Sequence, residues 1–264
     1  TFRLAPQSHS GEGKIFVNED LTNKLKVSGS LRSLTVLPAK RGSISKRQAD
    51  AIGALLNIDS CIKDINLQCI DMSESSNVSS MYSALKSNTS IKEAYMYGCR
   101  IGPRGGEAMA EILKVNSTLR IVNLYKNRLD DDGAAAILEG LKVNTSLDTL
   151  YLTSNGIGDE GCRDVRQFLK VNTTLDILYL GLNEIGWRGA MILAESVKEN
   201  RTLDTLNVYN NQIGDKGGMA MIEALKINDS LPTLNLKANN FSDAMMEVLK
   251  DMRAAKGPDF ELDL

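Results

Sequence analysis

The sequence has very few of the side chains on which enzyme chemistry most often depends. It contains one histidine, His9, which lies in a Gly/Ser-rich segment. Nucleophilic catalysis that pairs a serine or a cysteine with a histidine base is therefore disfavoured. The glycine-rich stretch 11–14 lacks the spacing and the following Ser or Thr of a phosphate-binding loop. We therefore expect a protein without catalytic activity.

Cysteine is almost as sparse. The four cysteines form no CxxC pair, and they are Cys61, Cys69, Cys99 and Cys162. Their spacing gives neither a disulfide framework nor a zinc site. We expect free thiols, which favour a reducing compartment, and we expect neither a metal nor a cofactor.

Excess charge and membrane-spanning runs are also missing. The chain has 31 Lys and Arg against 33 Asp and Glu, which gives a formal net charge of −2. Such a balance provides no overall attraction to nucleic acid or to acidic membranes. No apolar run approaches the ~18 residues that span a bilayer, and no signal peptide is visible. We expect an intracellular protein, most simply a cytoplasmic one.

What the sequence does have is an internal repeat. The pattern Leu-x-x-Leu-x-Leu-x-x-Asn-x-Ile, with small apolar replacements, begins at Leu119, Leu147, Leu175 and Leu203. Each copy starts 28 residues after the one before it. Self-similarity at a fixed period of this length predicts a stack of structural repeats rather than a closed globule.

The repeat can be followed in both directions. Further copies start at Leu231 and Asp259 downstream and at Ile91, Ile62 and Leu31 upstream, with looser spacing before Ile91. We therefore predict a repeat domain over residues 31–264, with about eight repeats and a final strand stub. An N-terminal cap over residues 1–30 would contain a strand near 16–17 and a helix from residue 19. The last strand would leave an open sheet edge that a partner or a second copy could cover.

Each unit predicts a strand, a loop and a helix. Alternate residues of the Leu-x-Leu segment point inward, as in a short strand. The asparagine at the ninth position should turn inward and bond backbone groups that the turn leaves unpaired. These units resemble the ribonuclease-inhibitor-like class of leucine-rich repeat, which also occurs in NOD-like receptors, tropomodulin and the Ran GTPase-activating protein. The resemblance implies an α/β solenoid, a horseshoe with a concave parallel sheet and convex helices.

A second asparagine recurs within Asn-x-Ser/Thr sequons. Six of them lie 28 residues apart, at Asn88, Asn116, Asn144, Asn172, Asn200 and Asn228, and Asn77 makes a seventh. In a secreted protein these would indicate glycosylation. We favour a structural use instead, in which the six periodic asparagines adopt a left-handed conformation that closes each helix. The Ser or Thr that follows would bond nearby backbone groups.

The outward positions of the predicted strands carry most of the tyrosines. Six of the seven should lie on the concave surface, namely Tyr95, Tyr97, Tyr125, Tyr151, Tyr179 and Tyr209. Ile121, Ile177 and Leu182 should lie among them, and charge there is sparse. Tyrosine is favoured in binding surfaces because it offers contact area and a polar tip at low entropic cost. The alternative is that the rings stack along the sheet and only stabilise it.

Two further features could contact a partner. Arg100 and Arg128 occupy the same position in successive units and form a basic corner with Arg104 and Lys126 nearby. This corner could meet an acidic partner, or it could be ordinary solvated loop charge. Trp187, the one tryptophan, could be an exposed contact residue or could pack against the neighbouring unit.

These observations predict a non-catalytic scaffold or adaptor that binds a protein or a peptide on its Tyr-rich concave face. It could be a subunit of a larger assembly. Two alternatives remain open, a small-GTPase regulator resembling the Ran GTPase-activating protein and the sensing arm of a larger NOD-like receptor. Against the first, the chain lacks a long acidic tail, and no arginine can be matched to a catalytic role.

Overall fold

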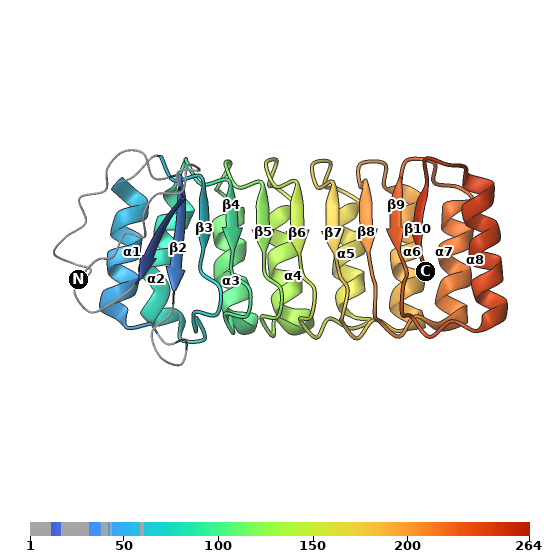
Figure 1. Cartoon of the computed structure of the whole chain (residues 1–264), viewed down its shortest axis with the longest axis horizontal. Coiled ribbons are helices and arrows are strands. Elements are labelled where there is room, and N and C mark those ends of the chain that lie inside the picture. The colour runs from blue at the N-terminus through green and yellow to red at the C-terminus, as the bar shows by residue number, and fades with distance from the viewer. Residues whose placement is uncertain (1–11, 17–31, 38–41, 43, 59–60) are drawn as a thin grey trace.

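The chain folds into a curved row of strand–helix units. The computed structural model describes residues 12–16, 32–37, 42, 44–58 and 61–264. Ten strands form one parallel sheet in which each strand lies beside its neighbours in sequence, from β1 at one edge to β10 at the other. Figure 1 shows the strands in this order with the helices behind them. This order is the signature of a solenoid that grows by one unit at a time.

The strands are short and the helices are longer. The strands are β1 Glu12–Phe16, β2 Ser33–Leu37, β3 Asp64–Asn66, β4 Glu93–Tyr95, β5 Ile121–Asn123, β6 Thr149–Tyr151, β7 Ile177–Tyr179, β8 Thr205–Asn207, β9 Thr233–Asn235 and β10 Glu261–Asp263. The helices are α1 Lys46–Ile58, α2 Ser75–Ser87, α3 Gly102–Leu113, α4 Asp130–Leu141, α5 Gly161–Leu169, α6 Trp187–Glu199, α7 Gly214–Leu225 and α8 Asp243–Lys256.

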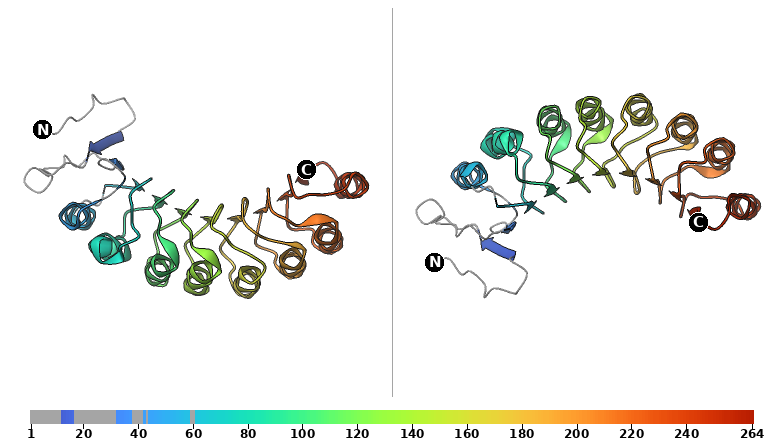
Figure 2. Two further views of the ribbon diagram at one scale, coloured as in Figure 1. Left: turned by 90° about the horizontal axis from the view of Figure 1, so that it is seen from below. Right: turned by 90° about the horizontal axis from the view of Figure 1, so that it is seen from above.

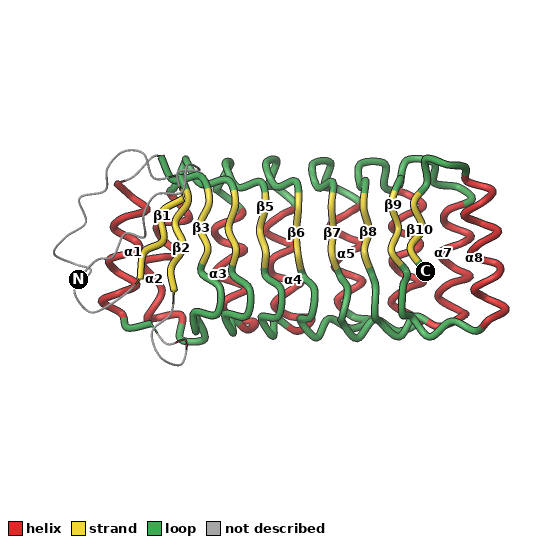
Figure 3. The backbone as a smooth tube through the Cα atoms, viewed as in Figure 1, coloured by secondary structure: helices red, strands yellow, loops and turns green. Residues whose placement is uncertain are grey.

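The sheet lines the inner side of an arc and the helices line its outer side (Figure 2). A helix is wider than a strand, so a row of strand–helix pairs bends toward its strands. The predicted α/β horseshoe with a concave parallel sheet is therefore confirmed. Connections from strand to helix lie along one rim of the arc and connections from helix to strand along the other (Figure 3). We call these the strand-to-helix rim and the helix-to-strand rim.

Leucines of the repeat fill the space between sheet and helices. In the unit around β6, the side chains of Leu147, Leu150 and Leu152 are almost completely buried. The helix on the other side contributes residues at helical spacing, such as Ile137 and Leu141 of α4. One continuous apolar cluster runs through the repeats, and its burial is the main stabilising term for a fold of this kind.

Inward-facing asparagines bind each unit to the one before it. The Asn155 side-chain amide donates to the Leu124 carbonyl at 2.9 Å, and its oxygen accepts the Asn127 N–H at 2.9 Å. The same position is buried in Asn127, Asn183, Asn211 and Asn239. This confirms the predicted inward turn. At Cys99, which replaces this asparagine, the thiol donates to the Leu67 carbonyl at 3.0 Å instead.

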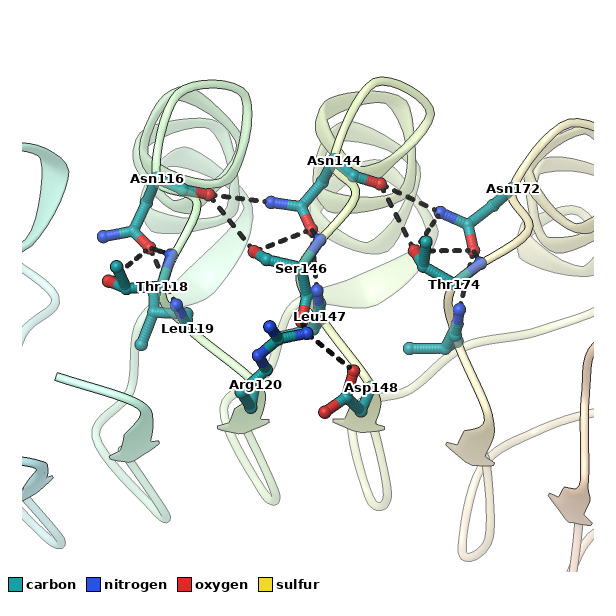
Figure 4. Close-up of polar contacts among 11 residues, drawn as sticks. Asn116, Thr118, Leu119, Arg120, Asn144, Ser146, Leu147, Asp148, Asn172 and Thr174 are labelled. Carbon is teal, nitrogen blue, oxygen red and sulfur yellow. Dashed lines mark hydrogen bonds and ion pairs between the residues drawn. The ribbon is translucent and has the colours of Figure 1, made fainter. Parts of the chain in front are cut away.

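The sequon asparagines form a second ladder on the helix-to-strand rim. Asn144 donates to the carbonyls of Leu113 at 2.8 Å and Asn116 at 3.0 Å, in the preceding connection. Its oxygen accepts the N–H groups of Ser146 at 2.9 Å and Leu147 at 2.8 Å. Figure 4 shows three successive units linked in this way. All six periodic asparagines are buried, so their structural use is confirmed.

The conformation expected for these asparagines is wrong. Asn88 has φ −69° and ψ 135°, and Asn200 has φ −76° and ψ 141°. Both are extended rather than left-handed, and the other four are not among the residues with positive φ. The chain turns directly into the approach to the next strand. An extended backbone allows the side-chain oxygen to reach the N–H groups two and three residues ahead, as in an Asx turn.

Carboxylates make a third set of contacts between units, on the strand-to-helix rim. Asp159 Oδ1 accepts the N–H groups of Gly186 and Gly189 in the next unit, both at 2.8 Å. Asp131 accepts the N–H of Gly158 at 2.7 Å in the same manner. A Cβ at Gly189 would lie 2.5 Å from Asp159 Oδ1, so glycine is needed there for the contact to form.

The N-terminal predictions are only partly tested. A strand does lie in the predicted cap, since β1 Glu12–Phe16 pairs in parallel with β2 Ser33–Leu37 and extends the sheet. His9 and the helix expected from residue 19 lie outside the described residues, and the boundary between cap and repeats stays a prediction. At the other end, β10 pairs with β9 and forms the edge of the sheet.

Replacing Asn144 by alanine should destabilise the fold by about 3 kcal/mol, because several buried backbone groups lose their partner. The matched control is Asn77→Ala. Asn77 also belongs to a sequon, but its side chain bonds only Glu74 at an exposed site, so its loss should change stability by under about 0.5 kcal/mol. Urea unfolding followed by circular dichroism measures both. Equal effects of the two substitutions would contradict the role of the ladder.

Candidate protein-interaction face

The concave face gathers the six predicted tyrosines into two rows that cross the strands. One row follows the paired positions Tyr95, Asn123, Tyr151, Tyr179 and Asn207. The other row lies two residues further along each strand and contains Tyr97, Tyr125 and Tyr209. All six side chains are half-buried. The seventh tyrosine, Tyr82, is buried in the core.

Four of these rings are stacked in pairs. Tyr151 and Tyr179 have ring centroids 4.3 Å apart and planes within 4° of each other. Tyr97 and Tyr125 have centroids 4.8 Å apart and an interplanar angle of 19°. In-register parallel strands place equivalent side chains about 4.8 Å apart, which is the spacing that ring stacking requires. The rings therefore stabilise one another and also present a flat aromatic surface.

Tyr209 is positioned by a glycine. A Cβ at Gly181 would lie 2.1 Å from the Tyr209 ring, so the ring rests directly on the backbone of the neighbouring unit. Any larger residue at position 181 would push the ring out of this place. Glycine at this position is therefore explained by the tyrosine one unit later, and it connects Tyr209 with the central part of the face.

The hydroxyls of Tyr95, Tyr151 and Tyr209 stay protonated near neutral pH. Burial and the adjacent Tyr179 hydroxyl raise the pKa of Tyr151. Burial and the nearby Tyr125 raise the pKa of Tyr209. For Tyr95 the pKa is raised by burial and by its hydrogen bond of 2.6 Å to Glu93 Oε2. The face therefore offers neutral hydroxyl groups that can both donate and accept.

The predicted apolar residues lie beside the rings. Ile121, Ile177 and Leu182 are half-buried and share the concave side with the tyrosines. Thr149 and Thr153 of the central units are buried beneath this surface. Ring faces, aliphatic groups and neutral hydroxyls together make a surface of the composition that partner proteins favour.

Arg100 and Arg128 lie at equivalent positions as predicted, but part of the positive charge of this basic corner is neutralised. Arg100 and Arg128 are exposed, and both have positive φ, 53° and 57°, at equivalent positions of the strand-to-helix rim. Arg100 forms an ion pair of 3.1 Å with Asp71. Burial would raise the pKa of Asp71, but hydrogen bonds from Ser73, together with the contact to Arg100, outweigh it and lower that pKa. The local positive charge available to a partner is therefore smaller than the sequence indicates.

Trp187 is partly exposed and also contacts the following unit. Its side chain is 37% exposed, and it opens α6 on the strand-to-helix rim. The cations of Arg188 and Lys216 lie 4.5 Å and 4.9 Å from the ring centroid. The ring borders a shallow hollow that also includes Gln212, Phe241 and other residues of the following units. Its faces are occupied by cations of the same chain, which reduces the area open to a partner.

The thiols and carboxylates do not gather into a chemical site among the residues that the structure describes. No group of three or more potential metal ligands occurs in that part of the chain. Cys99 and Cys162 are buried in the core, whereas Cys69 is exposed. The residues that the structure describes also include no helix long and apolar enough to cross a membrane.

Comparison with known proteins identifies the repeats. A family model described as Leucine Rich repeat matches residues 115–138, 143–165, 171–194 and 199–221. No curated protein matches the sequence. A solved structure of a Bacteroides fragilis protein superposes with a TM-score of 0.53 at 17% identity, over 93% of this chain and 67% of that chain.

Two further solved structures are similar to a lesser degree. Leiomodin-1 actin-binding site 2 gives a TM-score of 0.49 at 21% identity, over 56% of this chain and 87% of that one. The tropomodulin C-terminal domain of Caenorhabditis elegans gives 0.44 at 14% identity, over 67% and 92%.

Residues 115–221 carry leucine-rich repeats. Units with one strand and one helix continue on both sides of them, as expected for repeats of the ribonuclease-inhibitor-like class. Solenoids of this kind present an extended concave surface to other macromolecules. The architecture is thus that of a protein-interaction scaffold.

The environments of the thiols predict their reactivity. Burial raises the pKa of Cys99 to about 12, and burial and the nearby Asp159 also raise the pKa of Cys162. In the folded protein at pH 8, iodoacetamide should modify Cys69 and leave Cys99 and Cys162 unmodified, because the thiolate is the reactive form. Peptide mass mapping measures this, with urea-unfolded protein as the control. Equal labelling of Cys99 and Cys69 in the folded protein would contradict the burial of Cys99.

The stacked rings predict an energetic coupling. A double-mutant cycle on Tyr151→Ala and Tyr179→Ala should give a coupling of about 0.5–1.5 kcal/mol in the free energy of unfolding. The control cycle uses Tyr151→Ala with Tyr209→Ala, whose rings are not stacked on each other, and should be additive. Additivity in both cycles would show that stacking does not stabilise this face.

Proposed function

We propose that this protein is a non-catalytic scaffold that holds a protein or peptide partner against the concave tyrosine face. The observation that carries the proposal is the continuity of that face. Tyr151 stacks on Tyr179 in one row, Tyr97 stacks on Tyr125 in the other, and the Tyr209 ring rests on the backbone at Gly181. The tyrosine face extends beyond the two stacked pairs, so stacking alone does not explain it.

The chemistry of the face defines the partner. Ring faces favour aliphatic or aromatic side chains, and neutral hydroxyls favour backbone carbonyls and N–H groups. The Glu93 carboxylate is already bonded by Tyr95, so it offers little to a cationic partner. We therefore expect an extended or helical segment with apolar anchors rather than a highly charged one. The Ile121, Ile177 and Leu182 side chains would contact those anchors.

Two other functions make different demands on the molecule. A regulator of a small GTPase would use the strand-to-helix rim near Arg100 and Arg128, and it would change the rate of GTP hydrolysis. A sensing arm of a larger receptor would still require a ligand surface, and the tyrosine face is the strongest candidate on these residues. A hydrolysis assay with a panel of small GTPases separates the first alternative from the scaffold.

Affinity capture from source cells with Tyr151→Ala/Tyr179→Ala protein tests the proposal. We expect a stoichiometric partner with the unaltered chain and at least a tenfold loss of affinity in the variant, since anchor tyrosines each contribute about 1 kcal/mol or more. The matched control is Met191→Ala/Met219→Ala, which truncates two exposed residues on the convex helices α6 and α7.

The outcome is interpretable only for folded variants, so thermal unfolding is measured on all three proteins. Partner recovery that is unchanged in the tyrosine variant would exclude the concave face. Loss in both variants would indicate a partner that encloses the whole arc. Loss with Arg100→Ala/Arg128→Ala but not with the tyrosine variant would place the contact at the basic corner.

A further inference from the structure

The helix-to-strand rim carries a row of charges whose sign changes once. One residue immediately precedes the first residue of each strand from β2 to β8, and the sequence of these residues is Arg32, Lys63, Lys92, Arg120, Asp148, Asp176 and Asp204. Four cations on successive units are followed by three anions. We call this set the charge row.

The charge row is closely spaced and outward-facing. The strands that follow these residues pair in register, so neighbouring members are separated by about one strand spacing, ~4.8 Å. At the change of sign, Arg120 and Asp148 form an ion pair of 3.3 Å that Figure 4 shows at the foot of the asparagine ladder. Lys92, Asp176 and Asp204 are exposed, and no ion pair to these three occurs among the described residues.

Beyond the pair of Arg120 with Asp148, the acidic half of the row has no ion pair among the described residues. Burial, Asp204 and Asp148 together raise the pKa of Asp176, which shows that neighbouring carboxylates repel one another there. A cation brought to this end of the row would relieve the repulsion, and an anion would do the same at the basic end.

The same connections expose apolar side chains. Val115, Val143 and Val171 follow helices α3, α4 and α5 and are 58%, 66% and 54% exposed. The lysines before the first two are paired with Glu111 and Glu139 of their own helices. Single exposed apolar residues are ordinary, but a line of three on one rim is the kind of patch that marks a contact surface.

A second copy of this chain carries charges that complement the charge row. A two-fold axis between Arg120 and Asp148 reverses the row, so that cations of one copy meet anions of the other. Lys92 would face the partner's Asp176, and Lys63 would face the partner's Asp204. Interfaces with two-fold symmetry must be self-complementary in this sense.

The shape of the solenoid permits the same operation. If the axis runs along the radius of the arc, the rotation maps the curve onto itself in reverse (Figure 2). Two copies then remain in contact along the whole row instead of diverging. The axis also brings Val115 near the partner's Val143, so that apolar contacts lie at the centre and charges extend outward, as in other protein interfaces.

We propose that this chain forms an antiparallel two-fold dimer through its helix-to-strand rim. The two concave faces then open on the same side and form one surface that is doubled in width along the strand direction. The proposal does not depend on the partner-binding role of the tyrosines, because the charge row and the valines lie on the rim and not on the concave face.

Charge exchange tests the pairing directly. Analytical ultracentrifugation of the full chain, at concentrations up to about 100 μM, should show a monomer–dimer equilibrium that weakens with added salt. Lys92→Glu and Asp176→Lys should each raise the dissociation constant at least tenfold, since each places like charges opposite one another twice. An equimolar mixture of the two variants should restore the dimer, because the two introduced charges then face each other.

Matched variants define what would overturn the proposal. Arg104→Glu reverses an exposed charge on the opposite rim and should leave the dimer unchanged, as should Tyr151→Ala/Tyr179→Ala. A monomeric unaltered chain would refute the proposal, and so would full dimerisation of both charge variants. Two weakened variants that fail to recover on mixing would refute the two-fold pairing of Lys92 with Asp176. Thermal unfolding of each variant separates weakened association from unfolding.

Discussion

The structure depends on amide side chains that satisfy the backbone of a neighbouring unit. A three-residue strand and the turns around it leave inward-facing carbonyl and N–H groups that no element of the same unit can reach. Asn155 and Asn144 supply both a donor and an acceptor to such groups on the two sides of the core. Because each amide reaches into the preceding unit, an isolated repeat would bury unpaired polar groups at a cost of about 1–3 kcal/mol each. Stacking is therefore obligatory for these units.

The same ladders fix the register of the sheet, and register determines what the concave face presents. A slip of one residue would exchange the buried leucines with the outward residues, and the amides would no longer meet their carbonyls. With the register held, equivalent side chains lie one strand apart, which allows Tyr151 to stack on Tyr179. Residues that depart from the repeat then shape the concave face. Gly181 interrupts its row and thereby gives Tyr209 a place against the backbone. The tyrosine face is a product of a rigid register and a few local exceptions.

Periodicity was sufficient to predict the solenoid, the inward asparagines and the tyrosine rows, because each depends on spacing that one sequence displays. The concave and convex sides were predicted from the resemblance to ribonuclease-inhibitor-like repeats. Periodicity was insufficient wherever the answer depended on contacts between units. The backbone of the sequon asparagines is extended because their side-chain oxygens accept N–H groups in the approach to the next strand. The preference of asparagine for the left-handed conformation at helix ends therefore led to the wrong prediction. Asp131 and Asp159 lie at the starts of α4 and α5, where a carboxylate favours its own helix, yet they accept N–H groups 27 residues ahead. The ion pair of Arg100 with Asp71 also joins two units, and so it reduced a basic corner that looked stronger in the sequence.

Positions that repeat in every unit are needed by every unit, so they carry little information about a particular partner. The leucines, the two asparagine positions and the carboxylates of the strand-to-helix rim all belong to this set. What remains free to vary is the outward strand positions and the residues that precede each strand. In this chain both free sets are organised: the first is rich in tyrosine near the middle of the arc, and the second changes from basic to acidic at Arg120 and Asp148. Folding requires neither arrangement, since Thr, Asn and Lys occupy the same outward positions in other units. When residues of a scaffold are arranged in a way that stability does not require, that arrangement is the part of the molecule that most directly reflects association and recognition.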